Sequence, residues 1–489
     1  MTAGLTAKRP PGASPPPAGD SAALVSLYLS EGKIQPRSVH GWFAAWRWAL
    51  VWLTQAIFYG LPWLEWNGRQ AVLLDLASRR FYVLGLVLHP QDVIYLAALL
   101  IIAAFSLFFF TTVAGRLWCG FACPQTVYTE IFMWVEKVFE GGRPARIRLD
   151  AAPWTLNKLW KKSGKQLVWL AIGLWTGFTF VAYFSPARTL LGEISAFRLG
   201  PWEAFWIAFY GFATYGNAGY MREQVCKYMC PYARFQSAMF DKDTLIISYD
   251  EMRGEPRGSR PRGVTPISVN KGDCIDCLMC VQVCPTGIDI RKGLQYECIG
   301  CAACIDACDQ IMDKMSYPRG LIRYATQNAI KNRWSKAQMW KHVARPRVLV
   351  YATLLTLICT AFVISLALRA PVRADVVRDR GSLARIVDEG RIENVYRIQL
   401  MNETEAVQHI HIEVTGLETA TVSGTTDLEL KPTEAAWTPV AVQVAPEAAR
   451  RLGDGAHPMA FRIVSRDTGG GIDAKTHHVS EKSTFVIPR

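Results

Sequence analysis

The chain has 489 residues, of which 51% are hydrophobic, and it carries a formal net charge of +13. This length leaves room for several domains. The 17 Trp and 22 Phe are many for a soluble protein, and Lys and Arg cluster beside apolar runs. The charge therefore favours basic loops at a membrane over nucleic-acid binding. Twelve of the 13 Cys lie in short repeated motifs, which indicates metal ligands rather than disulfides.

The first 40 residues are predicted to form a disordered cytoplasmic segment. Their first half is rich in Pro, Ala and Gly and has few large apolar side chains, so it cannot form a core. No apolar stretch follows promptly, which argues against a cleavable signal peptide.

Apolar runs in the remainder predict about five transmembrane α-helices. The second run has no charge, and at ~1.5 Å per residue it can cross a hydrocarbon layer of ~30 Å. The fourth is the weakest because it contains Gly and Asn, and a re-entrant fourth run would leave four spans. The runs cover residues 48–64, 93–114, 167–184, 202–221 and 348–368.

The distribution of basic residues predicts the orientation of these runs. The loops after the second and fourth runs are rich in Lys and Arg, whereas the loops after the first and third hold few. Basic loops stay in the cytoplasm. Five spans then place the N-terminus and the cysteine-rich segment in the cytoplasm and the C-terminal region in the periplasm.

Eight cysteines form two quartets of equal spacing. Three closely spaced Cys, with a fourth that reaches the other cluster, are typical of bacterial two-cluster ferredoxins, and zinc rarely uses this spacing. By this crossing rule one [4Fe–4S] cluster takes Cys274, Cys277, Cys280 and Cys308, and the other takes Cys298, Cys301, Cys304 and Cys284. The segment is predicted to be a ferredoxin-like α+β domain. Pro285 follows the first quartet, and Asp309 stands at the matching place in the second.

Two further cysteine pairs lie where the second and fourth runs end. They are Cys119 with Cys123 and Cys226 with Cys230, each followed by proline. Proline biases the preceding residue towards extended backbone, so each pair is expected at a bend and the four thiols could converge. Converging thiols could bind copper, cycle as a dithiol and disulfide, or hold another iron–sulfur centre. Nearby Arg and Lys are expected to lower the pKa of these thiols.

Residues 370–489 contain no Cys and alternate between apolar and polar side chains. This pattern predicts an immunoglobulin-like β-sandwich. The resulting plan is a disordered segment, helices 1–2, a loop with the first Cys pair, helices 3–4, a segment with the second pair, the ferredoxin-type domain, helix 5 and a periplasmic β domain. Their predicted bounds are 1–40, 41–115, 116–166, 167–221, 222–270, 271–347, 348–369 and 370–489.

The motifs at 118–126, 228–236 and 298–309 resemble those of the cytochrome c oxidase accessory protein family called CcoG, FixG or RdxA. The resemblance covers nearly the whole chain. It implies a multi-pass protein of the bacterial inner membrane that assists assembly of a cbb-type oxidase. It also implies reduction of Cu(II) to Cu(I) at Cys119, Cys123, Cys226 and Cys230, which would act as catalytic residues and hold copper transiently.

The expected partners are an oxidase-assembly factor or copper chaperone and a cytoplasmic electron donor. Two other functions fit the sequence. One is a relay, similar to NapH and NosR, that carries electrons from quinol to a periplasmic reductase. The other is an assembly scaffold whose clusters serve only folding.

Overall fold

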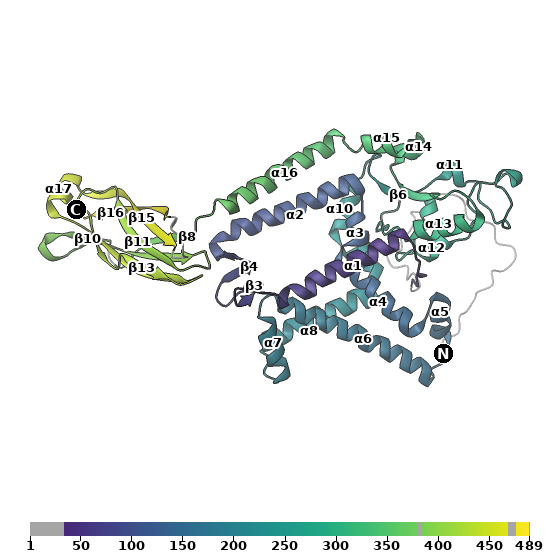
Figure 1. Ribbon diagram of the computed structural model, residues 1–489, viewed down its shortest axis with the longest axis horizontal. Helices are drawn as coiled ribbons and strands as arrows, with labels where there is room; N and C mark the ends of the chain where they lie inside the picture. Colours follow the sequence, from purple (N-terminus) through teal and green to yellow (C-terminus); the bar gives the residue numbers. More distant parts are fainter. Residues whose placement is uncertain (1–33, 380, 382, 468–475, 489) are drawn as a thin grey trace, which may run out of the picture.

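The computed structural model describes residues 34–379, 381, 383–467 and 476–488. Most of the segment predicted to be disordered, residues 1–33, lies outside these ranges. A group of long helices occupies the middle of the molecule, with the cysteine-rich segment at one end and a β-sandwich at the other (Figure 1).

All five apolar runs form helices. These helices are α1 (Trp42–Gly60), α2 (Val93–Ala114), α6 (Leu156–Val181), α8 (Pro201–Gly216) and α16 (Pro346–Ala367). Within the described residues, two helical stretches are long and apolar enough to cross a membrane, Pro90–Ala114 and Pro346–Ala367. Large apolar side chains such as Leu100 and Phe110 point outward from α2. These features indicate a membrane protein, and the count of five spans stays a prediction.

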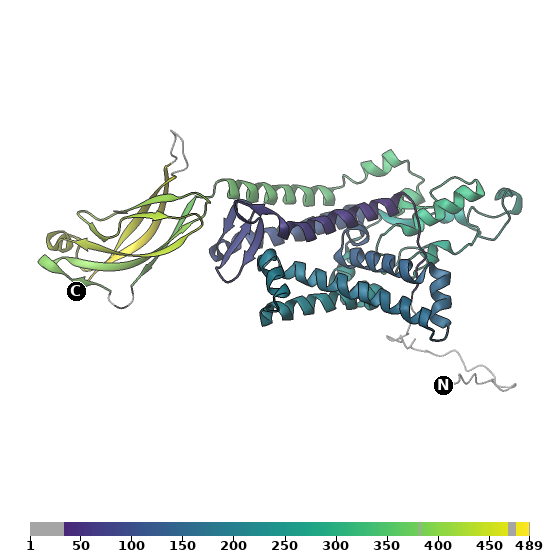
Figure 2. The ribbon, with the colours of Figure 1, turned by 60° about the horizontal axis from the view of Figure 1, so that its bottom comes forward.

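The helices form two neighbouring sets, in which α16 lies along α2 and α8 lies along α6 (Figures 1 and 2). Glycines allow the second pair to approach closely. A Cβ atom on Gly173 would lie 2.7 Å from the Gly211 carbonyl oxygen, and one on Gly177 would lie 2.1 Å from that of Ile207. Gly173 and Gly177 of the third run and Gly211 of the fourth therefore belong to a tight helix contact, as expected for packed membrane helices.

Helix α8 has 16 residues and continues into a π-helical turn, η3 (Asn217–Met221). Further helices lie on the side of the cysteine-rich segment. They are α3 (Leu117–Phe121), α4 (Pro124–Glu140), α5 (Arg143–Ala151), α9 (Arg222–Gln224), the π-helical η4 (Val225–Met229) and α10 (Pro231–Met239). The buried carboxylate of Glu136 joins three of these parts, because it pairs with Arg146 at 2.9 Å and with Arg222 at 3.0 Å.

The cysteine-rich segment is built on a two-stranded antiparallel sheet, β6 (Ile246–Tyr249) with β7 (Ile322–Ala325). Two helices follow the cysteine loops, α12 (Met279–Gln282) and α13 (Ala303–Met315). Three short helices complete the segment: α11 (Glu251–Gly254), α14 (Gln327–Lys331) and α15 (Lys336–Lys341). Both helices and strands are present, as predicted.

The C-terminal region is a sandwich of two antiparallel sheets. One sheet contains β8 (Val372–Arg378), β10 (Ile392–Asn402), β12 (Thr421–Gly424) and β14 (Ala435–Val444), with β9 (Arg385–Ile386) at its edge. The other contains β11 (Gln408–Thr415), β13 (Asp427–Leu430), β15 (Gly455–Asp467) and β16 (Thr476–Ile487). Alternate residues such as Tyr396, Ile398 and Ile410 are buried between the sheets, which confirms the predicted period of two. A short helix, α17 (Pro446–Leu452), lies at the far end.

A smaller sheet between α1 and α2 was not predicted. It consists of β3 (Val72–Asp75), β4 (Arg80–Val83) and β5 (Leu86–Leu88). A short strand pair, β1 (Glu65–Trp66) and β2 (Arg69–Gln70), precedes it in the chain. The 3₁₀ turn η2 (Pro90–Asp92) follows it and leads into α2. Helix α7 (Ala187–Ser195) lies on the same side.

Ion pairs connect this side of the helical part to the sandwich. Arg369, just after α16, pairs with Asp92 and with Glu403 at 2.7 Å. His89 lies beside these two carboxylates, with possible ligand atoms of the three within 4.8 Å of one another. Because Arg369 pairs with both carboxylates and Arg373 also pairs with Asp92, we interpret this group as an ion-pair network.

Candidate iron–sulfur and thiol site

The eight quartet cysteines line two cavities. One cavity is lined by Cys274, Cys277, Cys280 and Cys308. The other is lined by Cys284, Cys298, Cys301 and Cys304, together with Cys280. Each cavity therefore combines three cysteines of one quartet with the fourth cysteine of the other, as the crossing rule predicts. Because Cys280 lines both, the two cavities are adjacent.

Both quartets follow the same backbone path. The second residue after the first Cys and the first residue after the second Cys are left-handed in each loop: Asp276 (φ 54°) and Leu278 (φ 56°), then Gly300 (φ 70°) and Ala302 (φ 60°). For residues other than glycine this conformation costs about 1–2 kcal/mol. Strain of this kind persists where a loop must hold a ligand. The repeated loops and the four thiols at each cavity fit a [4Fe–4S] cluster, which supplies a one-electron carrier when bound.

The other two cysteine pairs adopt the predicted bend. Cys123 has φ −62° and ψ 130°, and Cys230 has φ −78° and ψ 110°, so both are extended. Each directly precedes a helix that begins with proline, α4 after Cys123 and α10 after Cys230. The fixed φ of proline suits the first position of a helix and excludes a helical residue before it.

The structure brings these four thiols together. Cys226 is influenced electrostatically by Cys119, Cys123 and Cys230 at once, and burial together with these neighbours raises its pKa to about 12. The thiol of Cys119 donates a hydrogen bond to Oε1 of the buried Gln236 at 3.5 Å. The predicted convergence of the two pairs is therefore present in the structure.

The expected net lowering of the thiol pKa is wrong for Cys119, Cys123 and Cys226, because burial outweighs the nearby cations. Burial raises the pKa of Cys119 to about 11, and it also raises that of Cys123. Arg116 acts in the opposite direction on Cys119 and Cys226, but its effect is smaller than that of burial. The free energy lost when a thiolate leaves water is larger here than the electrostatic stabilisation that the buried guanidinium of Arg116 provides.

Arg116 connects the thiol site to the second quartet. Its guanidinium donates hydrogen bonds to the carbonyl oxygens of Cys298 and Ala233, each at 2.8 Å, and to that of Tyr296. Ala233 lies in α10, directly after the second thiol pair. One side chain therefore holds the first pair, the second pair and the Cys298 loop in a fixed arrangement.

The two sites also meet at glycines. A Cβ atom on Gly120 would lie 2.5 Å from the carbonyl oxygen of Gly300, so α3 rests directly on the cysteine loop. On the other side, Cys226 and Cys301 line the same small cavity. The thiol site and the cavity of the second quartet are therefore neighbours.

Sequence reasoning did not identify this contact, although a signal was present. Gly120 follows Cys119 and Gly300 precedes Cys301, so each motif contains a glycine next to a ligand candidate. Glycine in such a place often marks a close approach of two backbone segments.

The fold and these sites define an iron–sulfur electron-transfer protein of the membrane with a C-terminal immunoglobulin-like domain. Three family profiles match the chain. They are described as a 4Fe-4S dicluster domain over residues 221–327, a 4Fe-4S binding domain over residues 96–141 and the IG-like fold at the C-terminal of FixG over residues 362–488.

The chain belongs to the FixG/RdxA family. It is 43% identical to protein RdxB of Cereibacter sphaeroides over 398 residues, which cover 80% of this chain and 83% of RdxB. It is 39% identical to the nitrogen fixation protein FixG of Rhizobium meliloti over 427 residues, 81% of this chain and 82% of FixG. Protein RdxA of Cereibacter sphaeroides is 40% identical over 400 residues, 80% of this chain and 84% of RdxA.

A solved structure of a FixG-related protein from Vibrio parahaemolyticus is also similar. It shares 23% identity, covers 24% of this chain and 97% of its own, and gives a TM-score of 0.20.

Proposed function

We propose that this protein carries electrons from its two cysteine-quartet sites to the four thiols of Cys119, Cys123, Cys226 and Cys230, where Cu(II) is reduced to Cu(I). One observation supports this above all: Cys226 and Cys301 line the same cavity. Electrons that reach the second quartet then have a short path to the thiols.

The chemistry of the thiols suits this reaction. Each Cu(II) ion takes one electron, and thiolates bind the softer product Cu(I) better than the harder substrate, which favours reduction. Because the pKa of Cys119 and Cys226 is raised to about 11 and 12, these thiols are protonated before the metal arrives. Copper binding must therefore release protons.

The proposed setting is the inner membrane of a bacterium. The cysteine-rich segment would face the cytoplasm and the β-sandwich the periplasm, with five spans between them. The Cu(I) product would pass to a copper chaperone or another assembly factor of a cbb-type cytochrome c oxidase. This orientation is supported by the positions of the cysteine-rich segment and the β-sandwich, which lie at opposite ends of the molecule (Figure 1).

The test is reoxidation of dithionite-reduced, anaerobically purified protein by Cu(II) in a stopped-flow instrument. Alanine at all four residues, Cys119, Cys123, Cys226 and Cys230, should abolish the fast reoxidation while iron and labile sulfide stay unchanged. Cys359→Ala, in α16, is the matched control and should react like the wild type. Equal rates in the quadruple variant and the wild type would refute the proposal.

A second candidate for the four thiols is a further iron–sulfur centre. The 4Fe-4S binding domain profile matches residues 96–141, in which the only cysteines are Cys119 and Cys123. This candidate predicts iron and sulfide in excess of two [4Fe–4S] clusters, and loss of that excess in the quadruple variant. Copper reduction at the thiols predicts no excess.

A further inference from the structure

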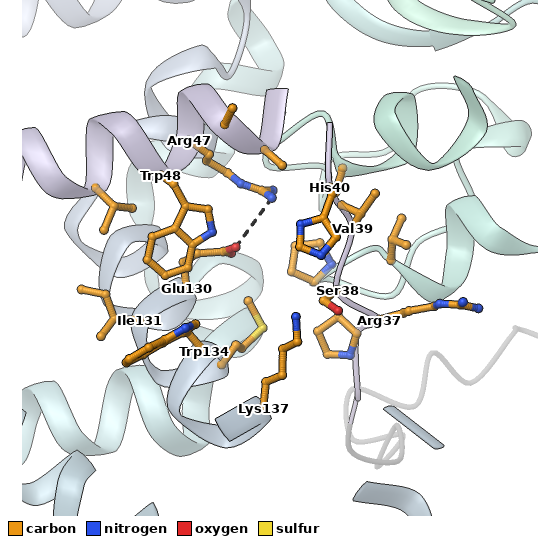
Figure 3. A pocket seen from close by; sticks show the side chains of 18 of the residues that line it. Arg37, Ser38, Val39, His40, Arg47, Trp48, Glu130, Ile131, Trp134 and Lys137 are labelled. Carbon is orange, nitrogen blue, oxygen red and sulfur yellow. Dashed lines mark ion pairs between the residues drawn. The ribbon is translucent and has the colours of Figure 1, made fainter. Parts of the chain in front are cut away.

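A large cavity lies between the helices and the cysteine-rich segment. Its volume is about 1030 Å³, and its walls come from α1, α4, α6 and the stretch before α1 (Figure 3). Small-molecule sites typically have ~300–1,000 Å³, so this cavity can hold an organic molecule with part of an apolar tail.

The two ends of the cavity differ in chemistry. Trp52 of α1 and Trp175 of α6 line the apolar end, and both residues are exposed on the helical part, Trp52 more than Trp175. Figure 3 shows His40, Glu130 and Lys137 around the polar end, with Trp48 and Trp134 beside them. The shape suits a molecule with a polar head and a lipid-like tail.

The polar end adjoins the cavity that Cys284, Cys298, Cys301 and Cys304 line. Pro285 and Ala303 line the cavity and are chain neighbours of Cys284 and Cys304. Arg47, only 5% exposed, donates a hydrogen bond to the Cys301 carbonyl at 3.3 Å and pairs with Glu130 at 3.6 Å. Its Nε has no hydrogen-bond partner within the described residues, so a buried donor remains for a ligand.

We infer that this cavity binds a quinol as the electron donor of the protein. The inference rests on the proposed function and names its reductant. Overall, one quinol and two Cu(II) ions give one quinone, two Cu(I) ions and two protons. The two electrons leave one at a time through the wall that Ala303 and Pro285 form. The carboxylate of Glu130 and the imidazole of His40 are placed to accept the two protons.

A membrane quinol takes the place of the cytoplasmic electron donor that was expected from the sequence. An anionic phospholipid would also fit the apolar end of the cavity and the basic side chains at its polar end. It would not require a carboxylate and an imidazole at the head, nor a position against the cysteine loop. These two features favour a molecule that gives up protons and electrons together.

The experiment uses the purified full-length protein in detergent under argon, with decylubiquinone as the probe. Quenching of tryptophan fluorescence measures binding, because Trp48, Trp52, Trp134 and Trp175 line the cavity. Ala45→Phe fills the cavity from an exposed position of α1, and Ala49→Phe, one helical turn further and outside the lining, is its control. Ala171→Phe fills it from α6 and serves if the first variant fails to fold.

The expected result is saturable quenching that is about tenfold weaker in Ala45→Phe and unchanged in Ala49→Phe, since an overfilled site loses affinity. Decylubiquinol should reduce the Ala45→Phe variant more slowly than the wild type, and it should reduce Ala49→Phe at the wild-type rate. Absence of saturable binding, equal binding in both variants, or displacement of the quinone by phosphatidylglycerol would overturn the inference.

A dithionite control separates this inference from the proposed function. Dithionite bypasses the cavity, so dithionite-reduced Ala45→Phe should reduce Cu(II) at the wild-type rate. If the dithionite-reduced wild type fails to reduce Cu(II) while quinone binding remains saturable, the proposed function fails and the quinol site stands.

Discussion

Arg116 shows how a single residue can fix the relative position of two redox sites. Its guanidinium has five donors in a rigid fork, and three carbonyl oxygens from two separate segments accept from it. Hydrogen bonds from a charged group contribute about 1.5–3 kcal/mol each. A lysine at this position could not reach all three acceptors in the same geometry.

Gly120 provides the sharpest test at this scale. In Gly120→Ala the new methyl group would meet the backbone of Gly300 at 2.5 Å, so α3 must move away from the cysteine loop. We expect slower Cu(II) reduction at unchanged iron content, measured by stopped-flow reoxidation. Gly192→Ala, where nothing lies within 4 Å, is the control. Equal rates in the two variants would show that this contact is not used.

The cysteine spacing predicts the two groups that share a cavity because the ligands of each cluster must come from short loops. It also predicts the bends, since proline constrains the residue before it. It could not predict the pKa of the thiols, which depends on burial by segments far away in the chain. Cys226, for example, packs against the buried apolar cluster that includes Ile299 and Ala303 beside the second quartet.

At the scale of elements, the apolar runs predict where helices form but not how far they extend. The third run begins at residue 167, whereas α6 begins at Leu156. The added part carries lysines that pair with carboxylates of α4: Lys165 lies 2.8 Å and Lys162 3.0 Å from Glu140. Hydrophobicity alone could not reveal these partners.

The contact between α6 and α8 is testable through its glycines. Gly177→Ala would place a methyl group 2.1 Å from the Ile207 carbonyl oxygen, and overpacking of this kind typically costs ~1–3 kcal/mol. We expect a lower midpoint of thermal unfolding in detergent. Gly216→Ala, with no atom within 4 Å, should be neutral or slightly stabilising. A stable Gly177→Ala variant would indicate that the helices are further apart.

At the scale of the whole molecule, the ion pairs around Arg369 hold the sandwich against the helical part. They join residues 89–92, 369–373 and 403, which are remote in sequence, so no local pattern could predict them. The single guanidinium of Arg369 serves two carboxylates. Burial and the nearby Asp92 therefore raise the pKa of Glu403 to about 7 from its ordinary 4.5.

This shift predicts a pH dependence. As pH rises above 4.5, the unfolded carboxyl of Glu403 loses its proton before the folded one does, so the stability of the folded state falls until about pH 7. Glu403→Gln stays neutral and lacks this decline. The unfolding midpoint of the wild type should therefore fall relative to the variant between pH 4.5 and 7. A relative rise over this range would contradict the raised pKa.

The proposed orientation is tested with reporter fusions. Alkaline phosphatase should be active when fused after the last residue and inactive when fused after Ala152, because it folds only in an oxidising compartment. Green fluorescent protein should give the opposite result. Phosphatase activity at Ala152 alone would show that the orientation is the reverse of the proposed one. Inactivity at both places would favour the four-span arrangement, which puts both fusion points in the cytoplasm.

The repeated left-handed residues of the two cysteine loops suggest that the segment arose by duplication of one short unit. Cys308 has joined the cavity of the earlier half, and Cys284 that of the later half. Each half thus supplies the fourth cysteine of the other half's cavity. Neither half supplies four cysteines to one cavity by itself, so we expect a cluster to be inserted only after the second loop has been synthesised.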